Sequence, residues 1–178
     1  MSTPNRLARI ARLTSIVLTA AASVARAESG PTTNDLDLAL AKRLAATGEA
    51  EAARLGAPGG AIAVVDDGGH LVLLLRLDGS FPAAAEVSEA KARTAALFRM
   101  PTENLENAIA SGRNALLGVD AMTPLKGGVP IAIGGRVVGA VGVSGAASAA
   151  QDTEIAQAIA ASVGAGVGAG SRDGKVGQ

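Results

Sequence analysis

The chain contains a single histidine, His70, so no other residue can supply an imidazole ligand or an imidazole general base. His70 follows the sequence Asp66-Asp67-Gly68-Gly69, which is typical of a tight turn between two strands. Two interpretations remain open. His70 either performs chemistry together with Asp66 or Asp67, or it is a polar turn residue whose ring forms a hydrogen bond within the hairpin.

Two carboxylates, Glu86 and Glu89, lie three residues apart in an alanine-rich segment that favours a helix. Residues at this spacing share one face of a helix, and Lys91 is close by in the sequence. Carboxylates on neighbouring turns could hold a hard cation such as Fe³⁺ through oxygen ligands. The alternative interpretation is a solvated helix face that binds nothing.

Further candidates lie in residues 111–126, which have no clean hydrophobic period and are expected to form a long loop. Loops of this length in compact domains are often functional. Met122 offers a thioether and Thr123 a hydroxyl, although methionine more often fills a core. They precede Gly127 and Gly128, where the backbone could approach a flat ligand closely.

Ser144 and Gly145 come just before the last predicted helix. Backbone amides at the N-terminus of a helix attract anions, so a carboxylate ligand could bind at these two residues. Ser144 is otherwise expected to serve as a cap for the helix.

Two predicted hairpins position these candidates. Residues 129–133 and 136–143 are β-branched runs that flank Gly134 and Gly135, which predicts a two-residue turn with positive φ angles. The second run is apolar or glycine at nearly every position, so we expect it in mid-sheet with both faces covered. Residues 61–65 and 70–77 predict the other hairpin.

The remaining segments predict helices. One should begin at a cap, Asn34 or Asp35, and end near Leu55. Another spans about residues 83–99, and its expected buried face comprises Val87, Ala90, Thr94, Ala95 and Phe98. A short helix is expected after a Thr102 cap, and a last one from Ser148 or Asp152 through Val163. Hairpins join antiparallel neighbours, so this order of elements predicts an α+β fold.

The N-terminal residues 1–27 are expected to be a secretory signal peptide. Three arginines among the first 12 residues precede an apolar run over residues 13–24, and Ala25-Arg26-Ala27 fits the small-x-small cleavage rule. The run falls short of the roughly 20 residues that a membrane-spanning helix needs. We therefore expect an exported protein, periplasmic or extracellular, that has no membrane contact after cleavage.

Composition narrows the partners further. Cleavage after Ala27 would remove four arginines and leave 12 basic against 16 acidic residues, a balance that disfavours nucleic acid or an anionic membrane as a partner. The chain has no cysteine, so the core and not a disulfide must stabilise it. Residues 28–163 are expected to form one domain, and the glycine-rich residues 164–178 a flexible tail.

Five sequence motifs, in chain order, carry a resemblance to a known family. They are Val64-Val-Asp-Asp-Gly-Gly-His-Leu71, Arg76-Leu-Asp-Gly79, Lys91-Ala-Arg-Thr-Ala95, Gly127-Gly-Val-Pro-Ile131, and Gly139-Ala-Val-Gly-Val-Ser-Gly145 followed by Gln151-Asp152. Over about residues 36–163 the chain resembles the GlcG/HbpS family, also called the DUF336 haem-degrading domain family. The resemblance implies a profilin-like α+β fold in α/β/α layers, with a five-stranded antiparallel sheet and helices on both faces. It also implies a tendency to form homo-oligomers and, in some members, haem or iron binding.

Two functions follow from these expectations. The first is an exported haem- or iron-binding protein with a sensing, scavenging or protective role. Its haem site would draw on residues 118–128 and the His70 hairpin, apart from an iron site at the glutamates, which match an acidic pair in haem-binding members. The candidate haem contacts are His70, Met122, Thr123, Gly127, Gly128, Ser144 and Gly145, and the candidate metal ligands are Glu86 and Glu89.

The second function is an accessory protein or an enzyme that acts on a small organic acid, with His70 and Asp66 or Asp67 as the acid/base pair. The export signal and the glutamate pair favour the first function. The lack of Tyr and Trp, which could stack on a porphyrin, favours the second. The sequence does not decide whether the protein is an enzyme.

Overall fold

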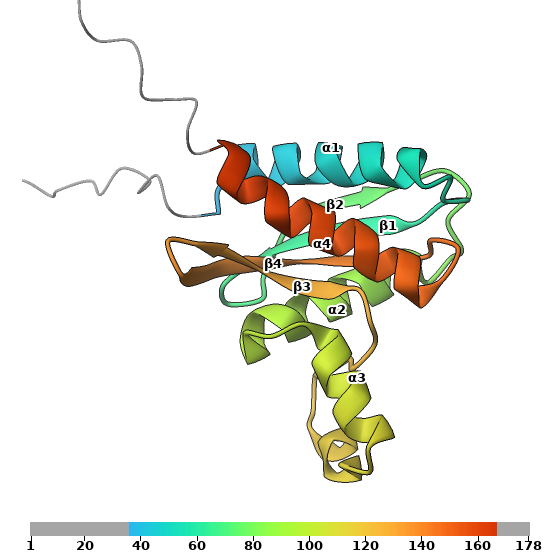
Figure 1. The fold of residues 1–178 in the computed structure, drawn as a ribbon, viewed down its shortest axis with the longest axis vertical. Coiled ribbons are helices and arrows are strands. Elements are labelled where there is room, and N and C mark those ends of the chain that lie inside the picture. The colour runs from blue at the N-terminus through green and yellow to red at the C-terminus, as the bar shows by residue number, and fades with distance from the viewer. Residues whose placement is uncertain (1–35, 167–178) are drawn as a thin grey trace, which may run out of the picture. The chain divides into compact units, whose positions relative to one another are not determined.

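The computed structural model describes residues 36–166 (Figure 1). The predicted signal peptide and most of the predicted tail lie outside the described residues. Within them, four α-helices and four strands follow the order α1, β1, β2, α2, α3, β3, β4 and α4, with a short 3₁₀ helix before β3. None of the helices in this part of the chain is long and apolar enough to span a membrane.

The four strands form one antiparallel sheet in the order β2-β1-β4-β3. Their bounds are Ala61–Asp66 for β1, Leu71–Arg76 for β2, Gly128–Ile133 for β3 and Arg136–Ser144 for β4. Both predicted hairpins are confirmed, and β4 lies in mid-sheet as expected. The fifth strand that the resemblance implies is not confirmed, because residues 36–166 contain four.

The turn between β3 and β4 has the predicted conformation. Gly134 and Gly135 have φ angles of 58° and 80°. Positive φ at both central residues is the signature of a type I′ turn, whose twist matches that of the strands it joins. The glycine pair therefore sets the register of the hairpin.

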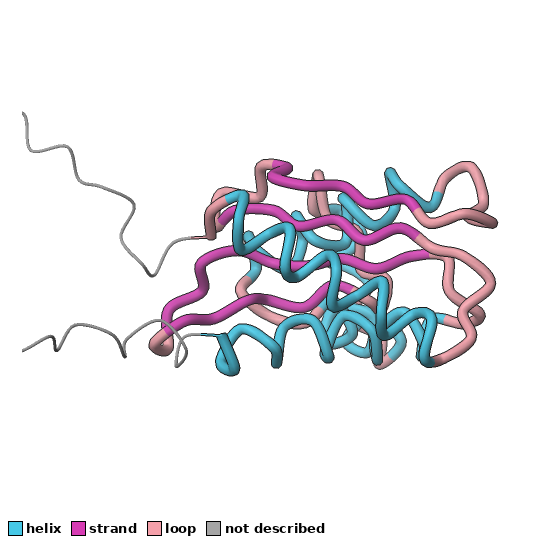
Figure 2. The backbone as a smooth tube through the Cα atoms, turned by 90° about the horizontal axis from the view of Figure 1, so that it is seen from above, coloured by secondary structure: helices cyan, strands magenta, loops and turns pink. Residues whose placement is uncertain are grey.

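Helices cover both faces of the sheet, as Figure 1 shows, and Figure 2 shows the four strands side by side with helices running along them. On one face lie α1, Leu38–Arg54, and α4, Ala149–Gly166. On the other lies α2, Ala84–Phe98. The helix α3, Thr102–Ala110, and the 3₁₀ helix, Asn114–Gly118, lie beyond α2.

Alternation along β1 divides the core in two. Ile62 and Val64 belong to the large cluster under α1 and α4, whereas Ala63 and Val65 belong to a smaller cluster under α2. The cluster under α2 consists mainly of alanine, because the helix packs so close to the strands that larger side chains would not fit between them. A Cβ atom added to Gly142 of β4 would lie 2.0 Å from a backbone oxygen of α2.

This close approach corrects the predicted buried face of α2. Thr94 and Ala95 are buried as expected, but Val87, Ala90 and Phe98 are only partly buried. The face that meets the sheet carries small or polar side chains instead, because larger ones would not fit against Gly142. Its other buried members are Ala84, Ser88, Lys91, Ala92 and Ala96.

Two predicted caps also differ. The α1 cap is Asp37, whose carboxylate accepts a 2.7 Å hydrogen bond from the Leu40 amide, so the helix begins later than expected. Thr102 is the first residue of α3, and its hydroxyl bonds to the loop before β3 instead of capping. Ser148 is confirmed as the residue before α4, where its hydroxyl accepts from the Gln151 amide at 3.1 Å.

Candidate functional site

A cavity of about 260 Å³ lies between α2 and the loop before β3. The loop contributes three consecutive residues, and α2 contributes residues at positions i, i+3, i+4 and i+7, which form one stripe along a helix. This stripe borders the face of α2 that meets the sheet. The lining residues are Glu86, Glu89, Ala90, Arg93, Ala121, Met122 and Thr123.

The cavity combines two predicted sites that the sequence suggested were separate. Glu86 and Glu89 share it with Met122 and Thr123. The expectation that the glutamate pair lies apart from the loop is therefore wrong. It failed because nothing local in the sequence indicates that residues 121–123 fold back onto α2.

Thr94 fixes the loop to the helix. Its hydroxyl accepts a 2.9 Å hydrogen bond from the Thr123 amide and donates to the Ala90 carbonyl at 2.8 Å. Ala121, two residues earlier, has a φ angle of 58°, which is a strained conformation for a residue with a side chain. Strained backbone of this kind clusters at binding and active sites, where the surrounding structure maintains it.

The far end of the loop is tied to α3. The Thr102 hydroxyl accepts from the Gly128 amide at 2.9 Å and donates to the Leu125 carbonyl at 2.6 Å. The Lys126 amide donates to the Glu106 carboxylate at 2.6 Å. The wall that carries Met122 is thus held by α2 on one side and by α3 on the other.

Arg93 joins the cavity to the turn between β1 and β2. Its Nε donates a hydrogen bond to the Gly69 carbonyl at 3.2 Å. Gly69 has a φ angle of 78°, and an added Cβ atom would lie 3.0 Å from the Arg93 Cγ atom. Only glycine therefore fits beneath this arginine without strain.

His70 lies in the same turn but does not line the cavity. Its side chain is 79% exposed, and its Nδ1 lies 3.1 Å from Oδ2 of Asp66. The structure therefore brings together one of the two predicted acid/base pairs, while Asp67 is exposed. Because Nδ1 faces Asp66, Nε2 is the ring nitrogen that an external ligand would meet.

Asp66 also organises the turn. Its Oδ1 accepts hydrogen bonds from the backbone amides of Gly68 at 2.9 Å and His70 at 2.8 Å. Partial burial raises the pKa of Asp66, but the hydrogen bonds from the backbone and ring of His70 and from Gly68 outweigh it and hold the pKa below its usual value. The carboxylate is therefore charged at neutral pH.

Gly127 and Gly128 do allow a close approach, but to the chain itself: a Cβ atom on Gly127 would lie 2.6 Å from the Val143 carbonyl oxygen of β4, and both glycines also pack against Lys91 of α2. A Cβ atom on Gly127 would lie 3.1 Å from the Lys91 Nζ atom, and one on Gly128 would lie 2.5 Å from the Lys91 carbonyl oxygen. Both glycines are buried and neither lines the cavity. Their place in the site is to let the loop reach the cavity wall.

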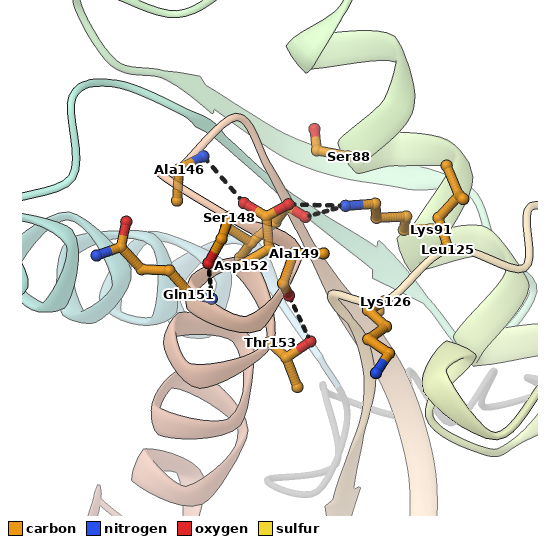
Figure 3. Close-up of polar contacts among 12 residues, drawn as sticks. Ser88, Lys91, Leu125, Lys126, Ala146, Ser148, Ala149, Gln151, Asp152 and Thr153 are labelled. Atoms are coloured by element: carbon orange, nitrogen blue, oxygen red, sulfur yellow. Dashed lines mark hydrogen bonds and ion pairs between the residues drawn. The ribbon is translucent and has the colours of Figure 1, made fainter. Parts of the chain in front are cut away.

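The two backbone amides that follow the predicted anion site at Ser144 and Gly145 bind the chain's own side chains. Beyond these residues, the Ala146 amide donates to the Asp152 carboxylate at 2.9 Å, as Figure 3 shows, and the Ala147 amide donates to the Gln151 side chain at 2.7 Å. Ser144 is buried in β4, and neither Ser144 nor Gly145 lines the cavity.

For a metal, the cavity offers two protein carboxylates. Within residues 36–166 no group of three or more His, Asp or Glu side chains is arranged to hold an ion. A cation bound by Glu86 and Glu89 would therefore need water or another ligand to complete its coordination. Such a site would bind a hard cation with modest affinity.

From the sequence, neither Arg93 nor Thr94 was placed in the site, and Thr94 was predicted only as a buried residue of the helix. Both lie in the motif Lys91-Ala-Arg-Thr-Ala95, so a signal was present. Helical spacing was a second signal, since Arg93 lies four residues after Glu89 and therefore on the same face of the helix. What the sequence could not reveal is that the loop and the hairpin turn both pack against this stretch of α2.

The protein consists of an antiparallel sheet between helical layers, with a cavity beside α2 that carries both acidic and basic residues. Comparison with known proteins identifies the family to which this architecture belongs. Residues 36–161 match the family model described as haem degrading protein HbpS-like. The chain therefore belongs to the GlcG/HbpS family, also known as DUF336.

Individual relatives agree with this assignment. Protein GlcG of Escherichia coli strain K12 is 51% identical over 83 residues, which is 47% of this chain and 62% of GlcG, so the match spans less than two thirds of that relative. Klebsiella pneumoniae protein ORFY has a TM-score of 0.69 at 28% identity, covering 77% of this chain and 96% of ORFY. A double glutamate-to-aspartate mutant of HbpS from Streptomyces reticuli has a TM-score of 0.67 at 28% identity, covering 89% of this chain and 97% of HbpS.

Proposed function

We propose that this chain is an exported haem- or iron-binding protein with a sensing, scavenging or protective role, and that the cavity beside α2 takes the ligand. The observation that carries the proposal is the composition of that single cavity. It presents two carboxylates, a guanidinium, a thioether and a hydroxyl within one space. The family description, which names haem degradation, supports haem as the ligand.

The lining residues fit part of a haem group. Ala90, Ala121 and the Met122 side chain offer apolar surface to a porphyrin edge, and the Met122 sulfur and the Thr123 hydroxyl are possible axial ligands. Bound haem would supply the redox chemistry of its iron. The cavity, at about 260 Å³, is smaller than sites that enclose a drug-sized ligand, so much of a porphyrin would remain outside it.

The same small volume favours a second candidate, a small organic acid. A single guanidinium in a compact space suits a carboxylate. The contact of 3.1 Å between His70 and Asp66 would supply an acid/base pair nearby, although His70 does not line the cavity. This candidate would make the protein an accessory protein or an enzyme of organic-acid metabolism.

An absorbance titration with haemin tests the haem proposal. The chain lacks Trp, Tyr and Cys, so the spectrum reports almost wholly on the cofactor. We expect saturable binding at one site per chain with a shifted Soret band. Met122→Ala or Thr123→Ala should move that band, since the loop supplies the ligand.

Two control variants make the titration specific. Met100→Ala removes a methionine that does not line the cavity and should leave the band unchanged. His70→Ala should leave it unchanged for the same reason. A spectrum identical to that of free haemin would overturn the haem proposal, and a band moved by His70→Ala alone would place the ligand at the turn instead of the cavity.

Export is part of the proposal and rests on residues 1–27. Sequencing the N-terminus of the exported protein should give a chain that begins at Glu28. A retained N-terminus in the cytoplasm would contradict export without bearing on haem binding.

Assembly into a homo-oligomer is also proposed. The edge strand β2 exposes Leu71 and Leu74, at 44% and 40%, whereas the opposite edge strand β3 carries Pro130, which lacks an amide donor. The β2 edge is thus the less protected one, and a second copy of the chain is its expected partner. Light scattering should give a mass of several chains, and Leu74→Lys should lower it; a wild-type mass of one chain at micromolar concentration would contradict assembly.

A further inference from the structure

We infer that Arg93 is the carboxylate-binding residue of the cavity and that the turn between β1 and β2 positions it. The inference rests on the proposed function only in taking the same cavity as the binding site. The shared chemistry is a carboxylate, supplied either by a propionate of haem or by a free organic acid.

The first observation is a salt bridge that does not form. Glu89 and Arg93 lie four residues apart on α2, in the orientation that usually gives a helical ion pair. Among the ion pairs of the described residues, however, none includes Arg93. Its Nε instead donates to the Gly69 carbonyl at 3.2 Å.

The second observation is that the turn is shaped to hold the arginine. Gly69 packs directly on α2, where an added Cβ atom would lie 3.0 Å from the Arg93 Cγ atom and 3.4 Å from the Leu97 Cγ atom. The hydrogen bond through Nε leaves both terminal amino groups of the guanidinium for a ligand. Two parallel N–H donors are the arrangement that binds a carboxylate in bidentate fashion.

The third observation is the distribution of charge. Arg93 is the one basic residue among those that line the cavity, and Glu86 and Glu89 are the acidic ones. A ligand with both a cationic centre and a carboxylate matches this arrangement at each end. Ferric haem meets the requirement with its iron and its propionates, whereas a simple organic acid meets only the guanidinium.

Binding measurements with Arg93→Gln and Arg93→Lys test the inference. Arg93→Gln should lower the affinity for haemin by about 10- to 100-fold, the effect expected for losing hydrogen bonds to a charged group. The haemin affinity of Arg93→Lys should lie between those of wild type and Arg93→Gln, because an ammonium keeps the positive charge but cannot bind a carboxylate in bidentate fashion. Arg43→Gln, an exposed arginine of α1 on the other face of the sheet, is the matched control and should change nothing.

Haemin dimethyl ester separates the carboxylate from the rest of the ligand. It keeps the iron and the porphyrin but has no free carboxylate, so wild type and Arg93→Gln should bind it equally. Calorimetry with lactate tests the other source. Lactate binding that Arg93→Gln abolishes, in a protein that does not bind haemin, would assign the carboxylate to a free organic acid and replace the haem proposal.

The outcomes distinguish the inference from the proposed function. If wild type binds haemin and Arg93→Gln binds it equally well, the inference is wrong and the haem proposal stands. If wild type binds neither haemin nor lactate, both the inference about Arg93 and the haem proposal are wrong. Urea denaturation should show that Arg93→Gln still unfolds in one cooperative transition, with at most a small loss of stability from the missing hydrogen bond to the Gly69 carbonyl, since Arg93 is an exposed residue.

Discussion

Lys91 and Asp152 form a buried ion pair that joins the two sides of the sheet. The Lys91 Nζ atom lies 3.0 Å from Oδ2 of Asp152, and the two side chains are 4% and 8% exposed. Lys91 belongs to α2 on one face, and Asp152 to the first turn of α4 on the other. Figure 3 shows Lys91 and Asp152 pointing toward one another, and the Nζ atom also donates to the Val143 carbonyl at 2.9 Å.

We predict that breaking this pair strongly destabilises the fold. Lys91→Met leaves the Asp152 carboxylate buried without its cation, and Asp152→Asn leaves the Lys91 ammonium without its anion. Either change should lower the free energy of unfolding by about 3–5 kcal/mol. Urea denaturation followed by circular dichroism measures the loss.

The double variant provides the control. Lys91→Met combined with Asp152→Asn removes both charges and keeps an acceptor for the Ala146 amide. It should be more stable than the sum of the two single losses predicts, because residues in contact are coupled. Strict additivity would mean that the two charges do not interact in the folded protein.

Gly142 provides a second test, of the packing of α2 on the sheet. In Gly142→Ala the new methyl group would meet the Ser88 carbonyl oxygen at 2.0 Å and the Ala92 amide nitrogen at 2.6 Å. Overpacking against backbone typically costs about 1–3 kcal/mol or more. Gly118→Ala is the control, since nothing lies within 4 Å of its added Cβ atom. Equal melting temperatures for the two variants would contradict the packing described for α2.

The Asp66 carboxylate predicts how the turn responds to pH. Its pKa in the folded protein is lowered, while the unfolded value is about 3.9. A lowered folded pKa gives stability that is present above the unfolded value and lost as pH falls through the folded one. The effect should be small, because the Asp66 side chain is 38% exposed and solvent screens it.

Urea midpoints between pH 3 and pH 7 measure this contribution. The urea midpoint of wild type should be higher than that of Asp66→Asn at neutral pH, and the difference between the two midpoints should shrink below about pH 4. Asp67→Asn is the matched control, because Asp67 accepts no hydrogen bond within the described turn. A difference that grows on acidification would show that the carboxylate does not stabilise the folded turn.

The fold was predictable from the sequence because its signals are local. Apolar runs on either side of turn residues predicted both hairpins, and Gly134 with Gly135 predicted the turn that joins β3 to β4. The buried face of α2 was not fully predictable, because helical periodicity assigns the buried face to the most apolar residues. Ser88 and Lys91 face the sheet for reasons of size and ion pairing, which depend on Gly142 and Asp152 far away in the chain.

The candidate site was predictable only in parts. Glu86 with Glu89, and Met122 with Thr123, were each identified from local sequence, but their meeting in one cavity depends on the hydrogen bond between Thr94 and Thr123, 29 residues apart. The resemblance to the family located the right motifs without giving their geometry. Long-range contacts of this kind leave no periodic trace in a single sequence.

The shared cavity leads to the last prediction, which concerns Glu86 and Glu89. In Glu86→Gln combined with Glu89→Gln, binding of Fe³⁺ should be lost, since amide oxygens are poor substitutes for carboxylates around a hard cation. Haemin affinity should also fall, by about two- to fivefold, as expected for partly exposed charges that face the cationic iron. Metal-free protoporphyrin IX should bind the double variant and wild type alike.

Glu49→Gln combined with Glu154→Gln is the matched control. It changes the net charge equally on exposed helix surfaces and should affect none of these titrations. A glutamate double variant that loses iron but binds haemin unchanged would mean that iron and haem occupy separate sites despite the common cavity.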